Sequence, residues 1–214
     1  MDHPKFEVEV ALGDPRSGRG YVREIGKLNA ALPIAQPVYR SYYAFPEGSL
    51  TEQPPKSSIN GYEGPYFLPE IILDVDAPSP GEALERARGL VLQLREQFDV
   101  PEEWTRPYFS GTGFHVHLPD LFGIDPSERL PEVVRATYAK HFPDQDSKPL
   151  QAKCLIRLPR TLNQKSGLYK IPVPIEKLFS WTVEGVQEMA DEPREYEWEP
   201  WDDFEPIWSD LVVT

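Results

Sequence analysis

The sequence contains very little cysteine and no long apolar run. Its single cysteine, Cys154, rules out an internal disulfide bond. With one cysteine and four histidines a cysteine-rich zinc cluster is also excluded, so no zinc is expected and any metal would be held by oxygen ligands. No apolar run approaches the roughly 20 residues that cross a membrane, and Met1 to Ala11 alternates charges with valine instead of forming a signal-peptide core. These absences predict a soluble, cytoplasmic protein with no membrane partner.

Basic residues are also scarce, with 22 Lys and Arg against 35 Asp and Glu and a formal net charge of −13. This balance argues against nucleic acid as a partner, because phosphate binding usually requires a basic surface. Residues 181–214, however, hold 11 of the acidic residues and only one basic residue, Arg194. The other 180 residues carry 24 acidic and 21 basic groups and are close to neutral. We therefore divide the chain into a domain at 1–180 and an acidic, tryptophan-containing C-terminal segment at 181–214.

The hydrophobic pattern predicts strands that alternate with helices. Strand patterns occur at 1–12, 38–45, 67–76 and 154–158, and a strand–turn–strand pattern occurs at 108–118. Ser79 offers an N-cap hydroxyl, Pro80 and Glu82 follow in the first turn, and apolar residues continue at helical spacing to Phe98. A second helix is predicted at 131–142. This alternation predicts a mixed α/β (α+β) domain, and the sequence shows no internal repeat.

Two carboxylates follow the short apolar run from Ile71 to Leu73. Asp74 and Asp76 are two residues apart, so on a strand their side chains are expected on the same face. Two like charges this close favour a cation, and a carboxylate pair can hold two Mg²⁺ ions about 3.5–4 Å apart. Alone, the pattern also suits a solvated loop, a calcium-binding loop or a sugar-nucleotide glycosyltransferase.

A turn rich in glycine and hydroxyl groups follows an aromatic strand. Its residues are Ser110, Gly111, Thr112 and Gly113. Glycine lets main-chain N–H groups approach an anion closely. His115 and His117 come next on one strand face, and an imidazole can donate to a phosphate oxygen or bind a metal. The His-x-His pair also occurs in zinc hydrolases, and a hairpin with one buried and one solvated histidine gives the same pattern.

Three cations lie close together at the end of the apolar strand at 154–158. They are Arg157, Arg160 and Lys165. Arginine binds planar oxyanions with two hydrogen bonds, and lysine supplies a point charge, so this loop has the chemistry of a phosphate clamp. The plainer interpretation is a basic loop that balances an acidic protein.

In this order, the three motifs resemble the archaeo-eukaryotic primase superfamily, which includes the catalytic small subunits of primases and PrimPol-type enzymes. Residues 71–76 (IILDVD) resemble its first motif, and residues 109–119 (FSGTGFHVHLP) resemble its second. Residues 155–168 (LIRLPRTLNQKSGL) resemble the Arg-Leu-Pro and Lys-Thr-Gly-Leu run of primase small subunits. The resemblance covers roughly residues 38–173 and implies a small N-terminal α/β module packed on an RRM-like catalytic sheet.

The resemblance also implies a metal site. Asp74, Asp76 and a third carboxylate would bind two Mg²⁺ or Mn²⁺ ions. The third carboxylate is expected in the stretch before the Arg-Leu-Pro run, where we choose Asp146 over Asp144.

A nucleotide site is implied in the same way. His115, helped by the turn at 110–113, would contact the phosphates of the incoming nucleotide. Arg157 and Lys165 would bind its triphosphate. Arg40 resembles a family arginine on a similar strand and is a weaker candidate for the same site.

The function implied is that of a template-dependent DNA primase and DNA polymerase, which transfers a nucleotide from a dNTP or NTP to a 3′-hydroxyl. Its partners would be a single-stranded DNA template, a primer, and a helicase or other replication proteins. The alternatives are a metal-dependent phosphodiesterase or nuclease and a non-catalytic DNA-binding module of replication initiation.

The C-terminal segment leaves three interpretations open. Trp181, Trp198, Trp201 and Trp208 argue against pure disorder. The tryptophans are expected to pack on the domain while the acidic residues only aid solubility. Alternatively, the acidic residues lie across or beside the template cleft and compete with nucleic acid, or recruit a basic partner.

Overall fold

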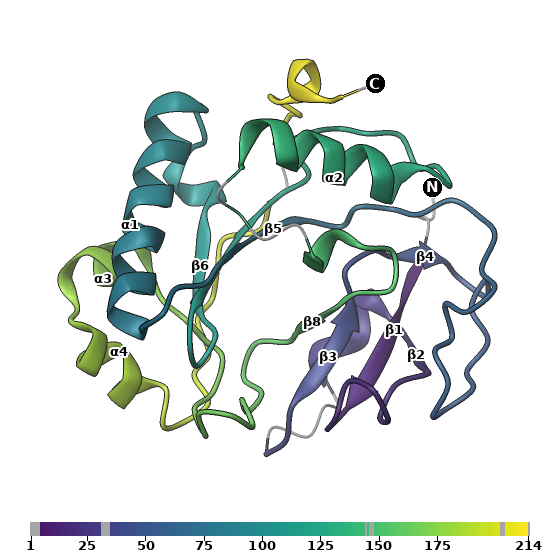
Figure 1. Ribbon diagram of the computed structural model, residues 1–214, viewed down its shortest axis with the longest axis horizontal. Coiled ribbons are helices and arrows are strands. Elements are labelled where there is room, and N and C mark those ends of the chain that lie inside the picture. The colour runs from purple at the N-terminus through teal and green to yellow at the C-terminus, as the bar shows by residue number, and fades with distance from the viewer. Residues whose placement is uncertain (1–4, 31–34, 144, 146–147, 202–203, 214) are drawn as a thin grey trace.

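Two antiparallel sheets and four α-helices form the part of the chain that the computed structural model describes (Figure 1). That part comprises residues 5–30, 35–143, 145, 148–201 and 204–213. The mixed architecture confirms the predicted combination of helices and strands. None of the described helices has the length and apolar character needed to cross a membrane.

The first sheet is built mainly from the N-terminal part of the chain. Its strands run in the order β2 (Tyr21–Glu24), β1 (Phe6–Leu12), β3 (Val38–Ser41) and β8 (Leu155–Arg157), and β4 (Phe45–Pro46) also pairs with β1. The strand predicted at 38–45 is therefore interrupted. The interruption coincides with a bend at which the Ser41 hydroxyl donates to the carbonyl oxygen of Tyr43, at 2.7 Å.

The charged face of β1 is covered by the proline-rich stretch at 47–64. On the apolar face, Val8 and Val10 are buried in a small core. On the charged face, Glu9 accepts from the main-chain N–H of Ser58 at 2.7 Å, and Glu7 accepts from that of Leu50 at 2.6 Å. The two carboxylates thus fasten an irregular stretch to the sheet.

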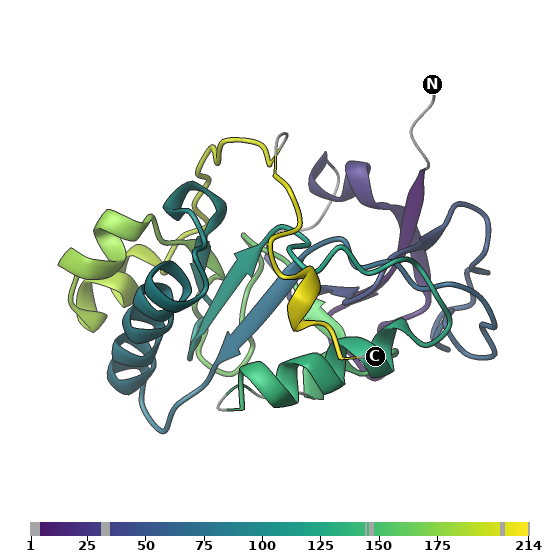
Figure 2. The same cartoon turned by 90° about the horizontal axis from the view of Figure 1, so that it is seen from above.

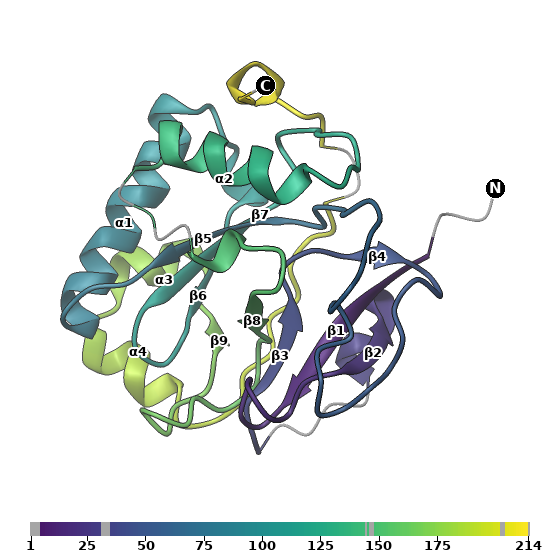
Figure 3. The same cartoon turned by 45° about the vertical axis from the view of Figure 1, so that its right-hand side comes forward.

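The second sheet contains the strands that carry the first two motifs. Its strand order is β5 (Ile71–Val75), β7 (Phe114–Leu118), β6 (Arg106–Phe109) and β9 (Ile171–Pro172). Since β7 is antiparallel to both β5 and β6, these two strands run parallel to each other, connected through α1 (Pro80–Gln97). This is a split β-α-β arrangement. In Figure 3 the two sheets lie next to each other, with β8 on the side of the first sheet that faces the second.

The helices pack mainly around the second sheet. The predicted N-cap of α1 is confirmed, because the main-chain N–H of Glu82 donates to the Ser79 hydroxyl at 3.2 Å. The predicted second helix is α2 (Leu130–His141). Two short helices, α3 (Ile175–Ser180) and α4 (Val183–Met189), were not predicted. They pack against α1.

The two faces of the second sheet differ in polarity. One face is apolar, and its Leu73, Phe114 and Val116 share the main core with buried residues of α1. The strand register places polar residues together on the other face: Asp74 pairs with His115, which pairs with Tyr108, and His117 pairs with Arg106. The predicted location of His115 and His117 on one strand face is thus confirmed. The polar face holds the candidate site.

The C-terminal segment shares the core of the domain. Val186, Ala190 and Trp208 are buried in the main core cluster. The Trp208 indole N–H donates to the carbonyl oxygen of Phe98 at 3.1 Å, and its main-chain N–H donates to that of Leu121 at 2.8 Å. In Figure 2 the first part of the segment lies on one side of β5 and β6, and α1 and α2 lie on the other side. The segment then passes to α2 near the C-terminus. The expectation that the tryptophans pack on the domain is confirmed for Trp208.

Replacing Trp208 with alanine should lower the free energy of unfolding by about 3–5 kcal/mol, the usual cost of removing a buried aromatic side chain. Only 2% of Trp208 is exposed, whereas 39% of its neighbour Ile207 is exposed. Urea denaturation of the Trp208→Ala and Ile207→Ala variants measures the difference. Ile207→Ala should cost about 1 kcal/mol or less. Equal costs for the two variants would show that the segment is not part of the core.

Candidate functional site

A buried lysine lies at the centre of the polar face. Lys170 has no exposed surface. Its Nζ lies 2.8 Å from Nδ1 of His115, 3.1 Å from Nε2 of His117 and 3.0 Å from the carbonyl oxygen of Arg157. Burial lowers the pKa of Lys170 well below its usual value, whereas the charges of Glu70 and Asp74 favour the ammonium form. In that form the group has three donors and no acceptor, so the three neighbours match its capacity. Lys170 therefore donates to both imidazoles.

The contacts of Lys170 also fix the position of the hydrogen on each ring. Because Nδ1 of His115 accepts, its hydrogen lies on Nε2, which faces Oδ1 of Asp74 at 3.5 Å. Because Nε2 of His117 accepts, its hydrogen lies on Nδ1, which donates to Glu70 at 2.7 Å. The result is a chain of five side chains from Asp74 to Glu70 along one face of the sheet.

The burial of this chain keeps both histidines neutral at pH 7. Burial, with smaller contributions from the nearby cations, lowers the pKa of His117 to about 4 although Glu70 opposes the change. Burial and then the charge of Lys170 lower the pKa of His115 well below its usual value. Burial alone would raise the pKa of Glu70, but the hydrogen bond from the neutral His117 ring and the charges of Arg40 and Lys170 outweigh it and hold that pKa well below its usual range.

Asp74 and Asp76 both line a cavity of about 470 Å³ beside α1. Arg86 and Gln145 contribute to the same lining, and Arg86 donates to the carbonyl oxygen of Asp76 at 3.0 Å. The side-chain oxygen of Gln145 is buried and has no hydrogen-bond partner among the residues that the structure describes. Two carboxylates and an amide oxygen therefore meet at one cavity.

These oxygen donors fit a hard divalent cation such as Mg²⁺ or Mn²⁺. The predicted third ligand, Asp146, and its alternative, Asp144, lie outside the described residues. Among those that are described, no group of three or more His, Cys, Asp or Glu side chains is placed to hold a metal.

The turn between β6 and β7 requires glycine at two positions. A Cβ atom on Gly113 would lie 2.6 Å from the carbonyl oxygen of Val75 and 2.7 Å from Oδ1 of Asp76. Gly111 has a φ of +92°, and a Cβ atom there would lie 2.8 Å from the hydroxyl oxygen of Ser166. The turn is therefore wedged between the end of β5 and the loop that carries the third motif, while Thr112 is exposed.

The third motif contacts the turn directly. The carbonyl oxygen of Ser110 accepts hydrogen bonds from the Arg157 guanidinium and from the Asn163 amide, the second at 3.0 Å. Arg157 is buried, and its Nε has no partner in the described part of the chain. Lys165 is exposed at the tip of the same loop. The structure thus brings the predicted residues of all three motifs together.

Arg40 makes its contacts inside the protein. It is buried, forms an ion pair with Glu70, and donates to the carbonyl oxygens of Ser41 and Tyr42. These contacts satisfy its guanidinium inside the protein. Its predicted contact with a nucleotide stays a prediction.

A second cavity, of about 270 Å³, lies between the two sheets. Arg40, Arg157, Glu70 and His117 contribute to its lining, and so does Trp201 of the C-terminal segment. This cavity borders the Glu70 end of the series of five side chains that runs from Asp74 to Glu70. The cavity lined by Asp74 and Asp76 borders the other end.

Lys170 and Glu70 are the site residues that the sequence reasoning missed. Each stands next to an apolar stretch: Lys170 precedes IPVPI, and Glu70 precedes IIL. A lone charge beside residues destined for the core is a signal of a buried, paired group. That signal could have identified both residues, although not their partners.

No protein-family model matches the chain, and no curated protein matches it either. The resemblance to the primase superfamily therefore depends on the three motifs and on their meeting in space.

The stability of the protein should fall as the pH decreases from 7 to 4.5. In this window the unfolded chain binds protons on His115 and His117 near pH 6.5, whereas in the folded protein the pKa of His117 is about 4 and burial holds the pKa of His115 well below its usual value. Asp120 opposes this effect, because burial raises its pKa to about 6. Since two histidines outweigh one carboxyl, the free energy of unfolding should fall by about 3 kcal/mol. Urea denaturation at several pH values measures it.

The Asp120→Asn variant tests the balance. It removes the opposing group and keeps the oxygen that accepts from the main-chain N–H groups of Phe122 and Gly123. Its loss of stability over the same window should be steeper than that of the wild type. A stability that does not change between pH 7 and 4.5 in either protein would contradict the neutral histidines.

Replacing Lys170 with methionine should destabilise the protein by about 3 kcal/mol or more, because three buried acceptors lose their donor. Methionine keeps most of the apolar stem and removes the ammonium. Lys165→Met makes the same change at an exposed position and should cost about 0.5 kcal/mol or less. Thermal or urea unfolding compares the two, and similar costs would show that the Lys170 contacts contribute little.

Proposed function

We propose that the chain is a template-dependent nucleotidyltransferase of the archaeo-eukaryotic primase type, acting as a DNA primase and DNA polymerase. One observation carries the proposal: three motifs far apart in the sequence meet at one place. Gly113 packs against Asp76, Gly111 packs against Ser166, and the Ser110 carbonyl oxygen accepts from Arg157. Carboxylates, an anion-binding turn and a basic loop are the parts that phosphoryl transfer needs.

The topology supports the proposal. In the split β-α-β arrangement of β5, α1 and β6, with β7 between the strands, Asp74 lies near the end of the first strand and Asp76 directly follows it, as expected for an RRM-like catalytic sheet. After α2 the chain enters the first sheet as β8 and returns as β9 beside β6. The N-terminal module that packs on this sheet contains β1–β4 and a short 3₁₀-helix, η1 (Ile25–Ala30).

The metal ions would be held by Asp74, Asp76 and the predicted third carboxylate, Asp146. Gln145 lines the cavity of the two described carboxylates, which supports a ligand from this stretch of the chain. Bound Mg²⁺ or Mn²⁺ would stabilise the charge on the attacking oxygen and on the leaving phosphate.

The described residues have clear tasks in this reaction, in which a 3′-hydroxyl attacks the α-phosphate of a nucleotide and diphosphate leaves. Neutral His115 presents its Nε2–H on the Asp74 side and can donate to a phosphate oxygen. Lys170 holds that ring in place from behind. The turn at 110–113 offers main-chain N–H groups, and exposed Lys165 offers a point charge for the triphosphate.

Primer extension tests the proposal. With a primed single-stranded template, labelled dNTPs or NTPs and Mg²⁺ or Mn²⁺, the wild type should extend the primer. Asp74→Asn and Asp76→Asn should each reduce the rate by about 1,000-fold or more, because losing an ion removes several kcal/mol of transition-state stabilisation. Asp125→Asn, an exposed carboxylate outside the cavity, should retain the wild-type rate.

The same assay separates the alternatives. A primer that is shortened in an Asp74-dependent way would indicate a phosphodiesterase or nuclease, which has less need of the basic loop at 157–165. Strand binding without any product would indicate a non-catalytic DNA-binding module. Near-normal extension by either aspartate variant would refute the metal site.

A further inference from the structure

Three arginines lie beneath the C-terminal segment, and each has an unused donor. Arg106 is on β6, Arg157 ends β8, and Arg160 follows three residues later. The Nε atom of each is buried and has no hydrogen-bond partner in the described part of the chain. We call Arg106, Arg157 and Arg160 the arginine strip.

The segment at 195–201 contacts this strip through an aromatic ring and a carboxylate. The Trp201 ring lies 3.7 Å from the guanidinium carbon of Arg106, which also donates to the carbonyl oxygen of Glu199. The Glu195 carboxylate lies 2.6 Å from the Arg160 guanidinium. A ring stacked on one arginine and an oxyanion paired with another are the contacts that a base and a phosphate of a single strand make.

The fit between 195–201 and the strip is incomplete. Besides the three arginine donors, the indole N–H of Trp201 is buried without a partner among the described residues. Such unsatisfied donors weaken the contact. The Glu195 side chain is 71% exposed, so its ion pair with Arg160 is weakly held. The firm anchor of the segment is Trp208, further along the chain.

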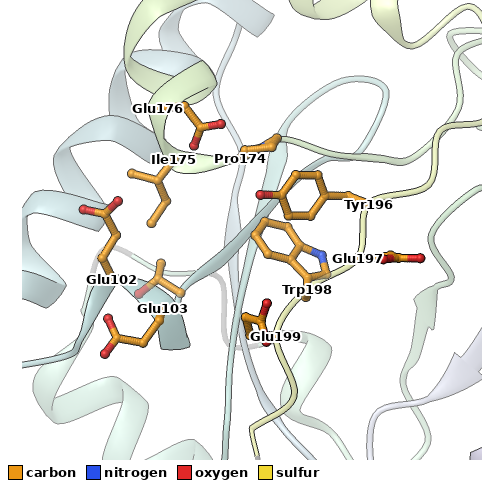
Figure 4. Close-up of a pocket in the computed structure, with 10 residues that line it drawn as sticks. Glu102, Glu103, Pro174, Ile175, Glu176, Tyr196, Glu197, Trp198 and Glu199 are labelled. Atoms are coloured by element: carbon orange, nitrogen blue, oxygen red, sulfur yellow. The ribbon is translucent and has the colours of Figure 1, made fainter.

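The other side of the segment is acidic. A pocket of about 480 Å³ lies there (Figure 4), and its lining includes Glu102, Glu103, Glu176, Glu197 and Glu199. The rings of Tyr196 and Trp198, 4.5 Å apart, form part of its wall. Phosphates would be repelled on this side, so a nucleic acid strand can only replace the segment on the arginine side, which leads to His117 and Lys170.

We propose that the arginine strip binds single-stranded nucleic acid and that residues 195–201 occupy it as an intramolecular competitor. A strand must displace this part of the segment to bind, while Trp208 keeps the rest of it in the core. The inference depends on the proposed function only in identifying the strand as the template.

The experiment measures strand binding without metal or nucleotide, by fluorescence anisotropy of a labelled oligothymidylate over a range of salt concentrations. Point variants are needed, because deleting the C-terminal segment would remove Val186 and Trp208 from the core. Trp201→Ala and Glu195→Gln remove the ring and the carboxylate that cover the strip. Glu205→Gln makes the same charge change at an exposed position of the segment and serves as the control.

Trp201→Ala should tighten binding about tenfold, because the ring no longer competes for Arg106. Glu195→Gln should tighten it about threefold at low salt and less at high salt, because salt screens the competing charge. Glu205→Gln should bind like the wild type. In the Trp201→Ala background, Arg106→Gln and Arg160→Gln should each weaken binding and reduce the slope of log affinity against log salt by about one.

Two results would overturn the inference. One is a Trp201→Ala protein that unfolds like the wild type and binds the oligonucleotide with wild-type affinity at every salt concentration. The other is tighter binding that persists after Arg106 and Arg160 are replaced, which would place the strand elsewhere. Primer extension distinguishes failure of this inference from failure of the proposed function. Variants that bind the oligonucleotide more tightly yet never extend a primer would refute the proposed function, and strand binding by the arginine strip would still stand.

Discussion

Lys170 places an ammonium group with no exposed surface between two imidazoles and a main-chain carbonyl oxygen, and the two sheets meet at that point. The imidazoles belong to β7 in the second sheet, and the carbonyl belongs to Arg157 in β8 of the first. Burial disfavours the charge of Lys170, and the carboxylates of Glu70 and Asp74 oppose that effect. The orientation of His115 towards Asp74, and hence the chemistry available at the carboxylate cavity, follows from this one group.

The three motifs meet because the main chain of the turn approaches its neighbours closely, and because the charged Arg157 donates to that turn. Glycine at 111 and 113 lets the turn fit between Asp76 and the loop of the third motif. A side chain at 113 would collide with the Val75 carbonyl oxygen and the Asp76 carboxylate, and one at 111 would collide with the side chains of Ser166 and Asn163. The turn thus contacts both the carboxylate at Asp76 and the basic loop. A substitution at either glycine would separate them without altering a charged residue.

The C-terminal segment has two parts with different physical roles. Around Trp208 it is core, since the indole is buried and hydrogen-bonded. Between Glu195 and Trp201 it is a cover whose contacts with arginines are partly exposed and incompletely paired. The acidic composition argued against nucleic acid as a partner. Part of that acidity, the Glu195 carboxylate, is paired with Arg160, a cation that would bind a nucleic acid strand.

The sequence by itself determined what local periodicity can encode: the strand that carries Asp74, helix α1 with its Ser79 cap, and the alternation that puts His115 and His117 on one face. Only the tertiary structure decided the rest. The two-residue strand β9 is too short to show a period, and α3 and α4, of 6 and 7 residues, are each shorter than two helical turns. The partners of Lys170 lie 55, 53 and 13 residues away, so no short window of sequence contains all of them. A lysine in an apolar stretch signals burial, but its acceptors are chosen by how the two sheets pack, because hydrogen bonds form between neighbours in space.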